Sequence, residues 1–480
     1  MQPVPESSAQ ALFQRGQEQI QRRDYAGAQR SLRQALASQP GFAQASGMLA
    51  YLLHQIDGQL DEAEALYRSA IAQAPRLPHL HMNLGTLLLQ QERFSEAEAA
   101  YANALTLEPG KSEHWSNLGS VYLRSQRDAD AEACLRQAIA LNPGSRLARF
   151  NLSYLQLRNQ HFAEGWALFE ARDWYARFEQ QFDFPRWQGQ DLQGRSLLLC
   201  LEAGHGDVIQ FVRYATLLKA RGTRQLSLLC HPALAPLMRS MPALDQVIPY
   251  SPGAAQSGYD YWMPLLSAPY QLHVAAASAA TGTPGTTAAL SAPAMHYAEL
   301  PYLTADAALR AHWKTQLPAD GLRVGLLWQG NPEFEFDRSR SLPDLQLLQP
   351  LWSVAGVQFV SLQTGAGALQ AQTCSAQQPM HCLGPQLRDF ADSAAIIAQL
   401  DLLISVDSAN AHLAGALGKP CWMLLPHFMC DWRWGRQRSD SHWYPGLLRL
   451  FRQAPDARWE PVIEDLRAAL AERVQATPAG

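Results

Sequence analysis

A short stretch near residue 407 carries three side chains that could take part in chemistry. Asp407, Ser408 and His412 follow an apolar run at residues 402–406, and small residues continue from there to Gly418. The apolar run is typical of a buried parallel strand, and the small residues predict a short helix directly after it. Ligands bind at such strand-to-helix turns, where free N–H groups at the helix start favour a phosphate. The stretch therefore predicts a phosphate site.

Two other chemistries use the same residue types, and the spacing argues against both. Asp407, Ser408 and His412 lie on one turn without a Gly-x-Ser-x-Gly elbow, which leaves no room for the geometry of a hydrolase triad. His412, His427 and Asp431 lack the His-Glu-x-x-His spacing of a zinc enzyme. We therefore expect neither a hydrolase triad nor a metal site.

A second turn with chemical potential lies near residue 207. A buried strand at residues 195–201 runs into a turn that contains Gly204, Gly206 and Asp207, and an amphipathic helix is predicted over residues 208–221. The two glycines would let the backbone approach a ligand closely. The aspartate stands where it could cap the following helix.

The elements around these turns alternate between strand and helix in two halves. The first half continues with a strand at residues 225–230, and the second begins with a strand that runs into a turn at residues 324–330. A polar loop at residues 331–341 follows and contains Arg338 and Arg340. This alternation predicts a bilobed α/β protein with a cleft between its lobes.

The first third of the chain is a repeat array. Alanines recur at spacings of 35, 34 and 34 residues, at Ala28, Ala63, Ala97 and Ala131. Prolines recur in step at Pro40, Pro75, Pro109 and Pro143. The pattern resembles the tetratricopeptide repeat, whose period is 34 residues. We predict four repeats over residues 9–145 and an atypical fifth, residues 149–174, which would cap the solenoid.

Such a solenoid offers a concave groove for a peptide or protein partner. Two alternatives remain, namely that the repeats only form homo-oligomers or only support the next domain. Asp128 and Asp130 match an Asp-x-Asp metal–nucleotide signature, but they fall inside a repeat, so we interpret them as solvated surface.

Composition narrows the function classes. The 480 residues carry a net charge of −4, which argues against a dominant role in binding nucleic acid or membrane surfaces. The start of the sequence has no signal-peptide pattern, and no apolar run is long enough to span a bilayer, so we expect a cytoplasmic protein. Seven scattered cysteines without a Cys-x-x-Cys pair fit reduced thiols.

Taken together, the motifs of the C-terminal region resemble those of a known family. They are Gly204-His205-Gly206-Asp207, Trp328-Gln329-Gly330-Asn331, Arg388-Asp389-Phe390-Ala391-Asp392, Asp407-Ser408 with His412, and Asp431-Trp432-Arg433-Trp434. The chain is similar to bacterial tetratricopeptide proteins fused to a glycosyltransferase domain of the GT-B fold, like the heptosyltransferases of family 9. The resemblance implies two Rossmann-like lobes facing a cleft. It also implies inverting sugar transfer from a nucleotide sugar, without a metal or cofactor.

The resemblance also implies roles for single residues. Asp207 would be the base that takes a proton from the acceptor hydroxyl, with Gly204, His205 and Gly206 as the acceptor-side loop. The donor-binding residues would be Trp328, Gly330, Arg338, Arg340, Asp407, Ser408, Ala409, Asn410 and His412. Among them, His412 would donate to the diphosphate, and Arg338 or Arg340 would neutralise a phosphate.

Structural interpretations stand beside several of these roles. Asp207 could cap a helix, and His412 could be a hydrogen-bonded histidine on the inner face of its helix. Arg338 and Arg340 could be solvated on a mobile loop. The tryptophans of the Asp431–Trp434 motif could border the donor, but we expect them in the core of a lobe.

These observations predict a division of the chain and a function. We expect a tail at 1–8, a repeat solenoid at 9–177, a linker at 178–194, an acceptor-side lobe at 195–305, a nucleotide-sugar lobe at 306–455, a closing helix at 456–475 and a tail at 476–480. Within the first lobe, residues 275–293 are rich in Ala, Gly, Thr and Ser and predict a flexible loop. The expected function is metal-independent inverting sugar transfer, with the repeats recruiting a protein acceptor. The alternatives are a non-catalytic repeat scaffold with a degenerate sugar-nucleotide domain, and a glycosyltransferase acting on a glycan or lipopolysaccharide.

Overall fold

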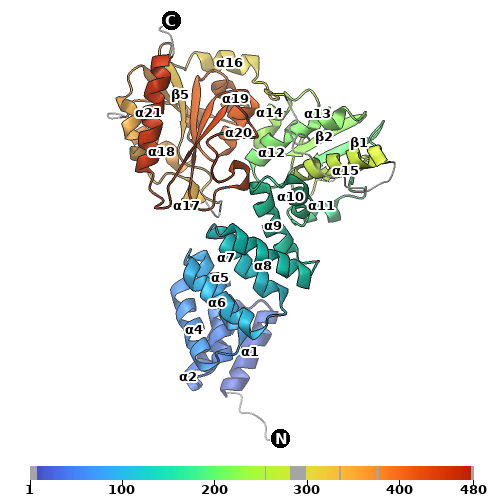
Figure 1. Ribbon diagram of the computed structural model, residues 1–480, viewed down its shortest axis with the longest axis vertical. Helices are drawn as coiled ribbons and strands as arrows, with labels where there is room; N and C mark the ends of the chain where they lie inside the picture. The colour runs from blue at the N-terminus through green and yellow to red at the C-terminus, as the bar shows by residue number, and fades with distance from the viewer. Residues whose placement is uncertain (1–7, 255, 282–298, 335–336, 374–377, 477–480) are drawn as a thin grey trace. The chain divides into compact units, whose positions relative to one another are not determined.

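A computed structural model describes residues 8–254, 256–281, 299–334, 337–373 and 378–476. The chain divides into two compact units, Met1–Leu155 and Gln156–Gly480. The first unit is helical, and the second contains two β-sheets with helices around them (Figure 1).

The first unit is built from successive helix pairs. They are α1 (Ala9–Gln21) with α2 (Tyr25–Ser38), α3 (Ala43–Leu52) with α4 (Leu60–Gln73), α5 (Pro78–Gln90) with α6 (Phe94–Leu107), and α7 (Ser112–Arg124) with α8 (Asp128–Leu141). A further helix, α9 (Arg146–Arg158), runs across the boundary between the two units.

The prolines and alanines of the repeat have separate structural roles. The second helix of each pair ends two residues before the repeat proline, because proline cannot continue a helix and restricts the residue before it. The four recurring alanines are fully buried. Gly165 occupies the next place in the series, where a Cβ atom would lie 2.8 Å from Leu157 Cδ2. These positions therefore need small side chains so that paired helices can approach closely.

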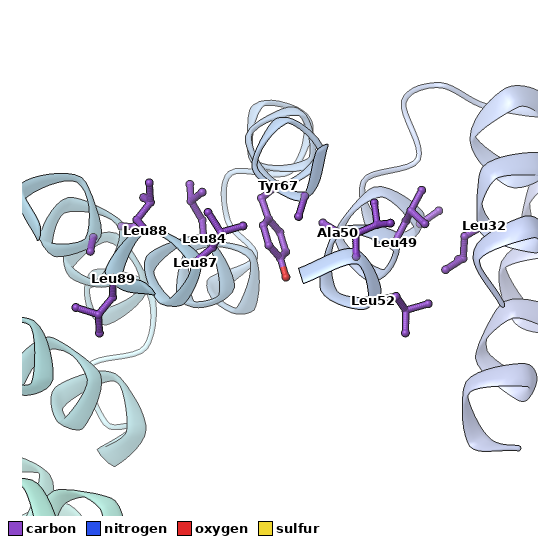
Figure 2. Close-up of a cluster of buried hydrophobic side chains, with 14 of the residues drawn as sticks. Leu32, Leu49, Ala50, Leu52, Tyr67, Leu84, Leu87, Leu88 and Leu89 are labelled. Atoms are coloured by element: carbon purple, nitrogen blue, oxygen red, sulfur yellow. The ribbon is translucent and has the colours of Figure 1, made fainter. Parts of the chain in front are cut away.

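The core of this unit runs from one helix pair to the next. Figure 2 shows Leu49 of α3, Tyr67 of α4 and Leu84 of α5 as members of one buried cluster. Gly85 also lies in this region, and a Cβ atom there would be 2.9 Å from the ring of Tyr101. Because each pair buries its apolar face against its neighbours, the pairs are stable as a stack rather than singly.

One repeat is a residue longer than the others, and the extra residue lies in a π-helical turn. α3 continues into π-helix η1 (Leu53–Asp57), and this pair has 17 residues between its helix starts where the others have 16. A π turn holds one residue more than an α turn, which accounts for the 35-residue spacing between Ala28 and Ala63. The inter-helix loops keep the same form, with a left-handed residue at Arg23, Gly58, Glu92, Gln126 and Gln160.

The second compact unit begins earlier than the predicted end of the solenoid at residue 177. The fifth helix pair ends with α10 (Phe162–Phe169), which packs on the α/β region. The Trp166 ring lies 5.8 Å from that of Phe211 and 5.4 Å from that of Trp432, measured between centroids. The aromatic side chains of the fifth pair thus tie residues from 156 onward to the α/β unit.

The segment predicted as a linker, residues 178–194, is packed rather than free. It starts inside α11 (Ala176–Gln181), and Phe178 and Trp187 are fully buried. The Trp187 N–H donates to the Trp262 carbonyl at 2.8 Å, beside an edge strand of the first sheet. The linker prediction was wrong because the aromatic residues of this segment supply core contacts.

The α/β unit contains two parallel sheets. The first sheet has the order β3-β2-β1-β4 and the second the order β10-β9-β8-β5-β6-β7, with every neighbouring pair parallel. Their strands are β1 (Ser196–Cys200), β2 (Gln225–Cys230), β3 (Gln246–Pro249), β4 (Tyr261–Pro264), β5 (Leu322–Leu327), β6 (Val357–Ser361), β7 (His381–Cys382), β8 (Leu402–Val406), β9 (Cys421–Leu425) and β10 (Leu448–Arg452).

Helices connect these strands. The α-helices are α12 (His205–Phe211), α13 (Ala215–Lys219), α14 (Ala235–Met238), α15 (Ala268–Thr281), α16 (Ala307–Lys314), α17 (Asp337–Arg340), α18 (Ala366–Thr373), α19 (Phe390–Ile397), α20 (Ala409–Ala416) and α21 (Glu460–Ala476). Short 3₁₀ segments are η2 (Val212–Tyr214), η3 (Pro232–Leu234), η4 (Leu265–Ser267), η6 (Leu345–Ser353), η7 (Gly384–Gln386) and η8 (Trp432–Trp434).

Two local predictions need correction, and one strand was not predicted. The helix predicted over residues 208–221 is broken into α12, η2 and α13, where Arg213 turns inward and its Nε donates to the Gln210 carbonyl. The loop predicted at residues 275–293 begins inside α15, and its part from 282 onward lies outside the described residues. Strand β10 was not predicted because arginines interrupt its short apolar pattern.

Candidate functional site

The strand orders identify where a ligand would bind. In the second sheet the chain proceeds outward from β5 to β7 and then returns to β8 on the other side, so the order reverses between β5 and β8. In the first sheet the same reversal occurs between β1 and β4. Ligands of open α/β sheets bind outside the carboxyl ends of the strands at such reversals. The turns after β1, β5 and β8 are the ones that the sequence singled out.

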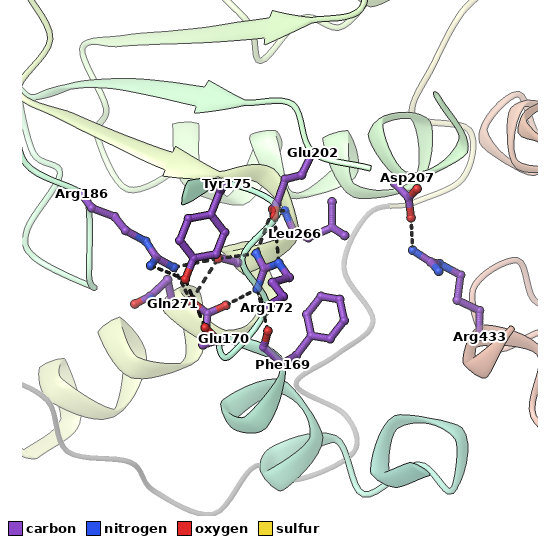
Figure 3. Close-up of polar contacts among 11 residues, drawn as sticks. Phe169, Glu170, Arg172, Tyr175, Arg186, Glu202, Asp207, Leu266, Gln271 and Arg433 are labelled. Atoms are coloured by element: carbon purple, nitrogen blue, oxygen red, sulfur yellow. Dashed lines mark hydrogen bonds and ion pairs between the residues drawn. The ribbon is translucent and has the colours of Figure 1, made fainter. Parts of the chain in front are cut away.

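Asp207 lies in the turn after β1, and both of its carboxylate oxygens have partners. Gly204 precedes α12, and Asp207 is the third residue of that helix. Its Oδ2 accepts the Gly204 N–H at 2.8 Å, so the carboxylate caps the helix start from within the first turn. Its Oδ1 forms an ion pair with Arg433 Nη2, and Figure 3 shows Arg433 reaching Asp207 from a separate segment of the chain, η8.

Arg433 is the residue that joins the two sheets at this point. Its Nη1 donates to both carboxylate oxygens of Asp431 at 3.1 Å, and its Nε donates to Gln210 Oε1. The guanidinium also lies over the Trp432 ring, 4.5 Å from the centroid. The side chain is buried, with 7% of its surface exposed. This arginine lies within the sequence motif at residues 431–434, but only the tryptophans of that motif carried a predicted role.

The turn after β8 carries Asp407 at the edge of the second sheet. Asp407 Oδ2 accepts the Trp434 Nε1–H at 2.9 Å. Burial, followed by the charge of Asp431, raises the pKa of Asp407 to about 6, while Trp434, Arg340 and Arg433 act in the opposite direction. Two negative charges therefore lie close together here, and the site already contains arginines that offset them.

The start of α20 offers backbone donors beside Asp407. Ser408 has extended backbone before the helix, and its hydroxyl lies 2.8 Å from that of Ser405. The N–H groups of Ala409 and Asn410 fall in the first turn, where a helix supplies no internal acceptor. The Asn410 Oδ1 atom is buried and has no hydrogen-bond partner among the described residues.

His412 is packed between the two sheets. Its Nδ1 lies 3.1 Å from the Tyr444 hydroxyl, and its ring centroid is 5.3 Å from that of Trp434. Burial, followed by Arg433 and Arg213, lowers the pKa of His412 well below its usual value, so the imidazole is neutral at pH 7. These contacts are those of a hydrogen-bonded inner-face histidine, and any donation to a ligand would come from a neutral ring.

The two helix starts touch each other through a glycine. A Cβ atom on Gly206 would lie 2.9 Å from His412 Cδ2 and 3.4 Å from the Ala409 Cα. α12 and α20 are therefore in direct contact, and Asp207 stands next to the point of closest approach. This contact brings the turns after β1 and β8 into one site.

The turn after β5 separates residues that the sequence grouped together. The Trp328 side chain is fully buried in the core of the second sheet, and its Nε1 donates to Gln370 Oε1 at 2.9 Å. The indole ring therefore fills the core, and a contact with a donor would have to come from another part of this turn. A Cβ atom on Gly330 would lie 2.7 Å from Arg340 Nη2, so this glycine leaves room for the arginine.

The two arginines of the loop after β5 are in different surroundings. Arg340 Nε forms an ion pair with Asp337 at 3.0 Å, and its guanidinium lies 4.5 Å from the Phe334 ring centroid. It is also near enough to Asp407 to lower that residue's pKa. Arg338 is exposed. The structure thus brings Arg340, and not Arg338, to the edge where Asp407 lies.

His205 completes the turn after β1. Its ring centroid lies 4.5 Å from that of His231 and 5.2 Å from that of Phe390 on α19. Burial and the nearby His231 lower the pKa of His205 to about 4, so the ring is neutral at pH 7. The acceptor-side loop predicted from the sequence therefore packs across to the second sheet.

A buried ion-pair network fixes the strand end from which this turn departs. Arg172 donates to both carboxylate oxygens of Glu202 at 2.8 Å, and its Nη1 donates to Glu170 at 2.8 Å (Figure 3). Glu202 also accepts the Leu266 N–H at 2.8 Å. No sequence motif pointed to this network, because Arg172 and Glu202 lie 30 residues apart in different elements.

The described residues lack metal clusters, membrane-spanning helices and disulfides. They contain no group of three or more His, Cys, Asp and Glu side chains arranged to hold a metal. None of their helices is both long enough and apolar enough to cross a membrane. The six described cysteines are free thiols, as the sequence predicted.

Comparison with known proteins identifies the first unit. The tetratricopeptide repeat family matches residues 13–78 through one of its models and residues 54–120 and 88–152 through another. The N-terminal repeats are tetratricopeptide repeats. Solved structures with similarity include Pseudomonas aeruginosa PilF, 28% identical over 34% of this chain and 75% of that chain, with a TM-score of 0.31. PilW, a type IV pilus biogenesis factor, is 22% identical over 36% and 78%, with a TM-score of 0.33.

One relative extends beyond the repeats. Protein FlbA of Caulobacter vibrioides is 30% identical over 332 residues, which are 64% of this chain and 52% of FlbA. The chain thus spans about half the length of this relative. Because the aligned region is longer than the first compact unit, the similarity continues into the α/β unit.

Proposed function

We propose that this chain is a metal-independent inverting glycosyltransferase of the GT-B type, with a protein acceptor recruited by its tetratricopeptide repeats. The observation that carries the proposal is the meeting of Asp207 with Arg433 and the start of α20. One partner lies at the carboxyl edge of the first sheet and the others at the carboxyl edge of the second. A donor and an acceptor bound at the two edges would therefore meet at this point.

The residues at the contact suit a single displacement. The acceptor oxygen would attack the anomeric carbon while its proton passes to a carboxylate oxygen of Asp207. The bond between that carbon and the phosphate oxygen would break, and its electron pair would leave with the nucleoside diphosphate. One attack from the face opposite the leaving group inverts the configuration of the sugar.

The leaving group needs positive charge where its own negative charge develops. Arg433 and Arg340 supply positive charge near the start of α20, and the N–H groups of Ala409 and Asn410 add donors there. Because carboxylates hold the two arginines, and the N–H groups belong to the backbone of a helix, these groups require little rearrangement when the diphosphate forms. His412 would contribute a neutral donor.

The repeats support the choice of a protein acceptor. Tetratricopeptide repeats generally bind protein segments, and a stack of four pairs presents an extended concave surface. This part of the proposal rests on the repeats and not on the chemistry of the site.

A nucleotide titration with a matched pair of variants tests the donor site. We expect one of UDP, GDP, ADP and CDP to raise the thermal midpoint of the wild type, because a ligand that binds only the folded state stabilises it. Arg340→Gln should weaken this binding about tenfold, whereas Arg338→Gln, two residues away and exposed, should leave it unchanged. If no nucleotide shifts the midpoint, the α/β unit is a scaffold and the repeats carry the function.

Transfer itself is tested with the sugar derivative of the nucleotide that binds. Proteins that co-purify with the wild type are incubated with it as acceptors, and Asp207→Asn should transfer nothing while still binding the nucleotide. Modification of a glycan or lipopolysaccharide fraction, with the proteins left unmodified, would overturn the choice of a protein acceptor.

A further inference from the structure

In the arrangement just described, each carboxylate oxygen of Asp207 already has a partner. Its Oδ2 is occupied by the Gly204 N–H and its Oδ1 by Arg433. A base must receive a proton on an oxygen within hydrogen-bond reach of the acceptor hydroxyl. Arg433 therefore competes with an acceptor hydroxyl for Oδ1 of Asp207.

The geometry points to the donor as the agent that opens the contact between Arg433 and Asp207. We infer that Arg433 is exchanged between Asp207 and the diphosphate of the nucleotide sugar, so that the base is released only when the donor is bound. The inference rests on the proposed function and deepens it, because it requires the donor to bind before the base can act.

The two terminal nitrogens of Arg433 have different partners, and only the Nη2 contact would have to change. Nη1 is held by both oxygens of Asp431, which lies two residues away on the same loop. Nη2 reaches across to Asp207 in the first sheet. Loss of the Asp207 contact would therefore leave the guanidinium attached to its own loop. A diphosphate is a stronger partner than one carboxylate because it carries more charge and more acceptor oxygens.

The predicted phosphate position is close to the contact of Arg433 with Asp207. Gly206, the residue before Asp207, approaches the Ala409 Cα at the start of α20, where a Cβ atom would be 3.4 Å away. The charge of Arg433 also acts on Asp407 and on His412, which flank the start of that helix. Arg433 thus contacts the proposed base, and its charge acts on residues at the helix that would bind the diphosphate.

Gln210 places an unpaired hydrogen-bond donor beside Arg433. Its side chain is fully buried, and its Oε1 accepts from Arg433 Nε, which fixes Nε2 as the donor end. That Nε2 atom is buried and has no hydrogen-bond acceptor among the described residues. Buried donors are normally paired, and an unpaired one beside an arginine is suited to an oxyanion.

A double-mutant cycle tests the exchange. The dissociation constant of the nucleoside diphosphate that stabilises the wild type is measured by calorimetry for the wild type, Asp207→Asn, Arg433→Gln and the double variant. Asp207→Asn removes the competitor for Arg433 and should bind about fivefold to tenfold tighter, whereas Arg433→Gln should bind at least tenfold weaker. The gain from Asp207→Asn should vanish in the Arg433→Gln background.

Each other result of the cycle overturns the inference. An equal gain in nucleotide affinity in both backgrounds would mean that Asp207 acts only by repelling the anion. Unchanged or weaker nucleotide binding by Asp207→Asn would mean that Asp207 does not compete for Arg433. The unphosphorylated nucleoside is the control and should bind all four proteins equally. If no nucleoside diphosphate binds the wild type, the proposed function fails and the exchange with it, which distinguishes that failure from the others.

A variant that keeps the charge covers the case in which Arg433→Gln does not fold. Arg433→Lys retains a cation next to Asp431 but cannot hold a carboxylate and a phosphate with separate nitrogens of a rigid fork. In the cycle it should reduce the gain from Asp207→Asn. A full gain in the Arg433→Lys background would contradict a role for the guanidinium.

Discussion

At the scale of single residues, Gly206 sets how closely the two sheets approach. A side chain there would meet His412 and Ala409 before any other described group. The glycine at 206 is thus needed for space, and the resemblance that grouped it with Gly204 did not distinguish their roles. A Cβ atom on Gly204 would meet the carboxylate oxygen of Asp207 at 3.3 Å and, in the part of the chain that the structure describes, no other atom within 4 Å.

We predict that Gly206→Ala lowers the free energy of unfolding by about 1–3 kcal/mol, because the added methyl group overpacks the contact between α12 and α20. Gly204→Ala is the matched control and should change it by less than about 1 kcal/mol, since a flexible carboxylate can move aside. Urea denaturation of both variants measures the difference. Equal midpoints for the two variants would contradict the close approach.

Asp407 makes the free energy of unfolding fall as the pH rises. Its pKa is about 6 in the folded protein and 3.8 by its ordinary value, so between these values the folded state binds the extra proton. Its contribution to stability is therefore fully present below about pH 4 and is lost as the pH rises through about 6.

We predict that Asp407→Asn cancels this loss, because the amide does not titrate and its oxygen can still accept the Trp434 N–H. The unfolding free energy of the variant relative to wild type should rise by on the order of 2 kcal/mol between about pH 4.5 and pH 7. Urea denaturation at several pH values measures it. A difference that stays constant with pH would contradict the raised pKa.

At the scale of elements, the π-helical turn at Leu53–Asp57 absorbs one residue without disturbing the stack. The helices before and after it keep their contacts, and the loop residue that follows keeps the left-handed conformation found in the other pairs. The repeat thus tolerates an insertion at the end of its first helix, where the extra residue faces solvent.

Deletion of Gln55 should convert this turn into α-helix and restore the 34-residue period. We expect the unfolding free energy to stay within about 1 kcal/mol of wild type, because Gln55 is exposed. Deletion of Thr86 from the middle of α5 is the control and should cost more than about 3 kcal/mol, since it rotates Leu87 and Leu88 out of the core. Thermal unfolding compares the two, and a large loss from deleting Gln55 would contradict the insertion.

At the scale of the whole molecule, the fifth helix pair continues the repeat pattern but packs in the α/β unit. It has the period of a repeat, yet Trp166 and Arg172 make their contacts with the α/β unit. Breaking a buried ion pair such as Arg172–Glu202 by removing one partner typically costs about 3–5 kcal/mol. The α/β unit therefore depends on residues that the sequence assigned to the solenoid.

A pair of truncated chains tests this boundary. Residues 146–480 should unfold in one cooperative transition, because they retain the fifth pair with all its contacts. Residues 178–480 should not fold, because Glu202 and Trp432 lose their buried partners. Tryptophan fluorescence during thermal unfolding distinguishes them. Equal midpoints for the two chains would assign the fifth pair to the solenoid alone.

The sequence by itself determined the features that depend on neighbouring residues. The repeat period was readable because small residues and prolines act within one helix pair, and the turns at Asp207 and Asp407 were readable because a strand, a turn and a helix follow each other directly. The burial of Trp432 and Trp434 was also predicted, since tryptophan more often fills a core than borders a ligand.

Only the tertiary structure decided which distant residues meet. Arg433 and Asp207 are 226 positions apart, and Arg340 differs from Arg338 only in the side of a short helix on which it lies. The sequence predicted that Trp328 binds the donor, and the structure shows that its side chain is buried in the core. Such pairings arise when separate elements pack against one another, and no local pattern encodes them, because the partner's distance along the chain is arbitrary.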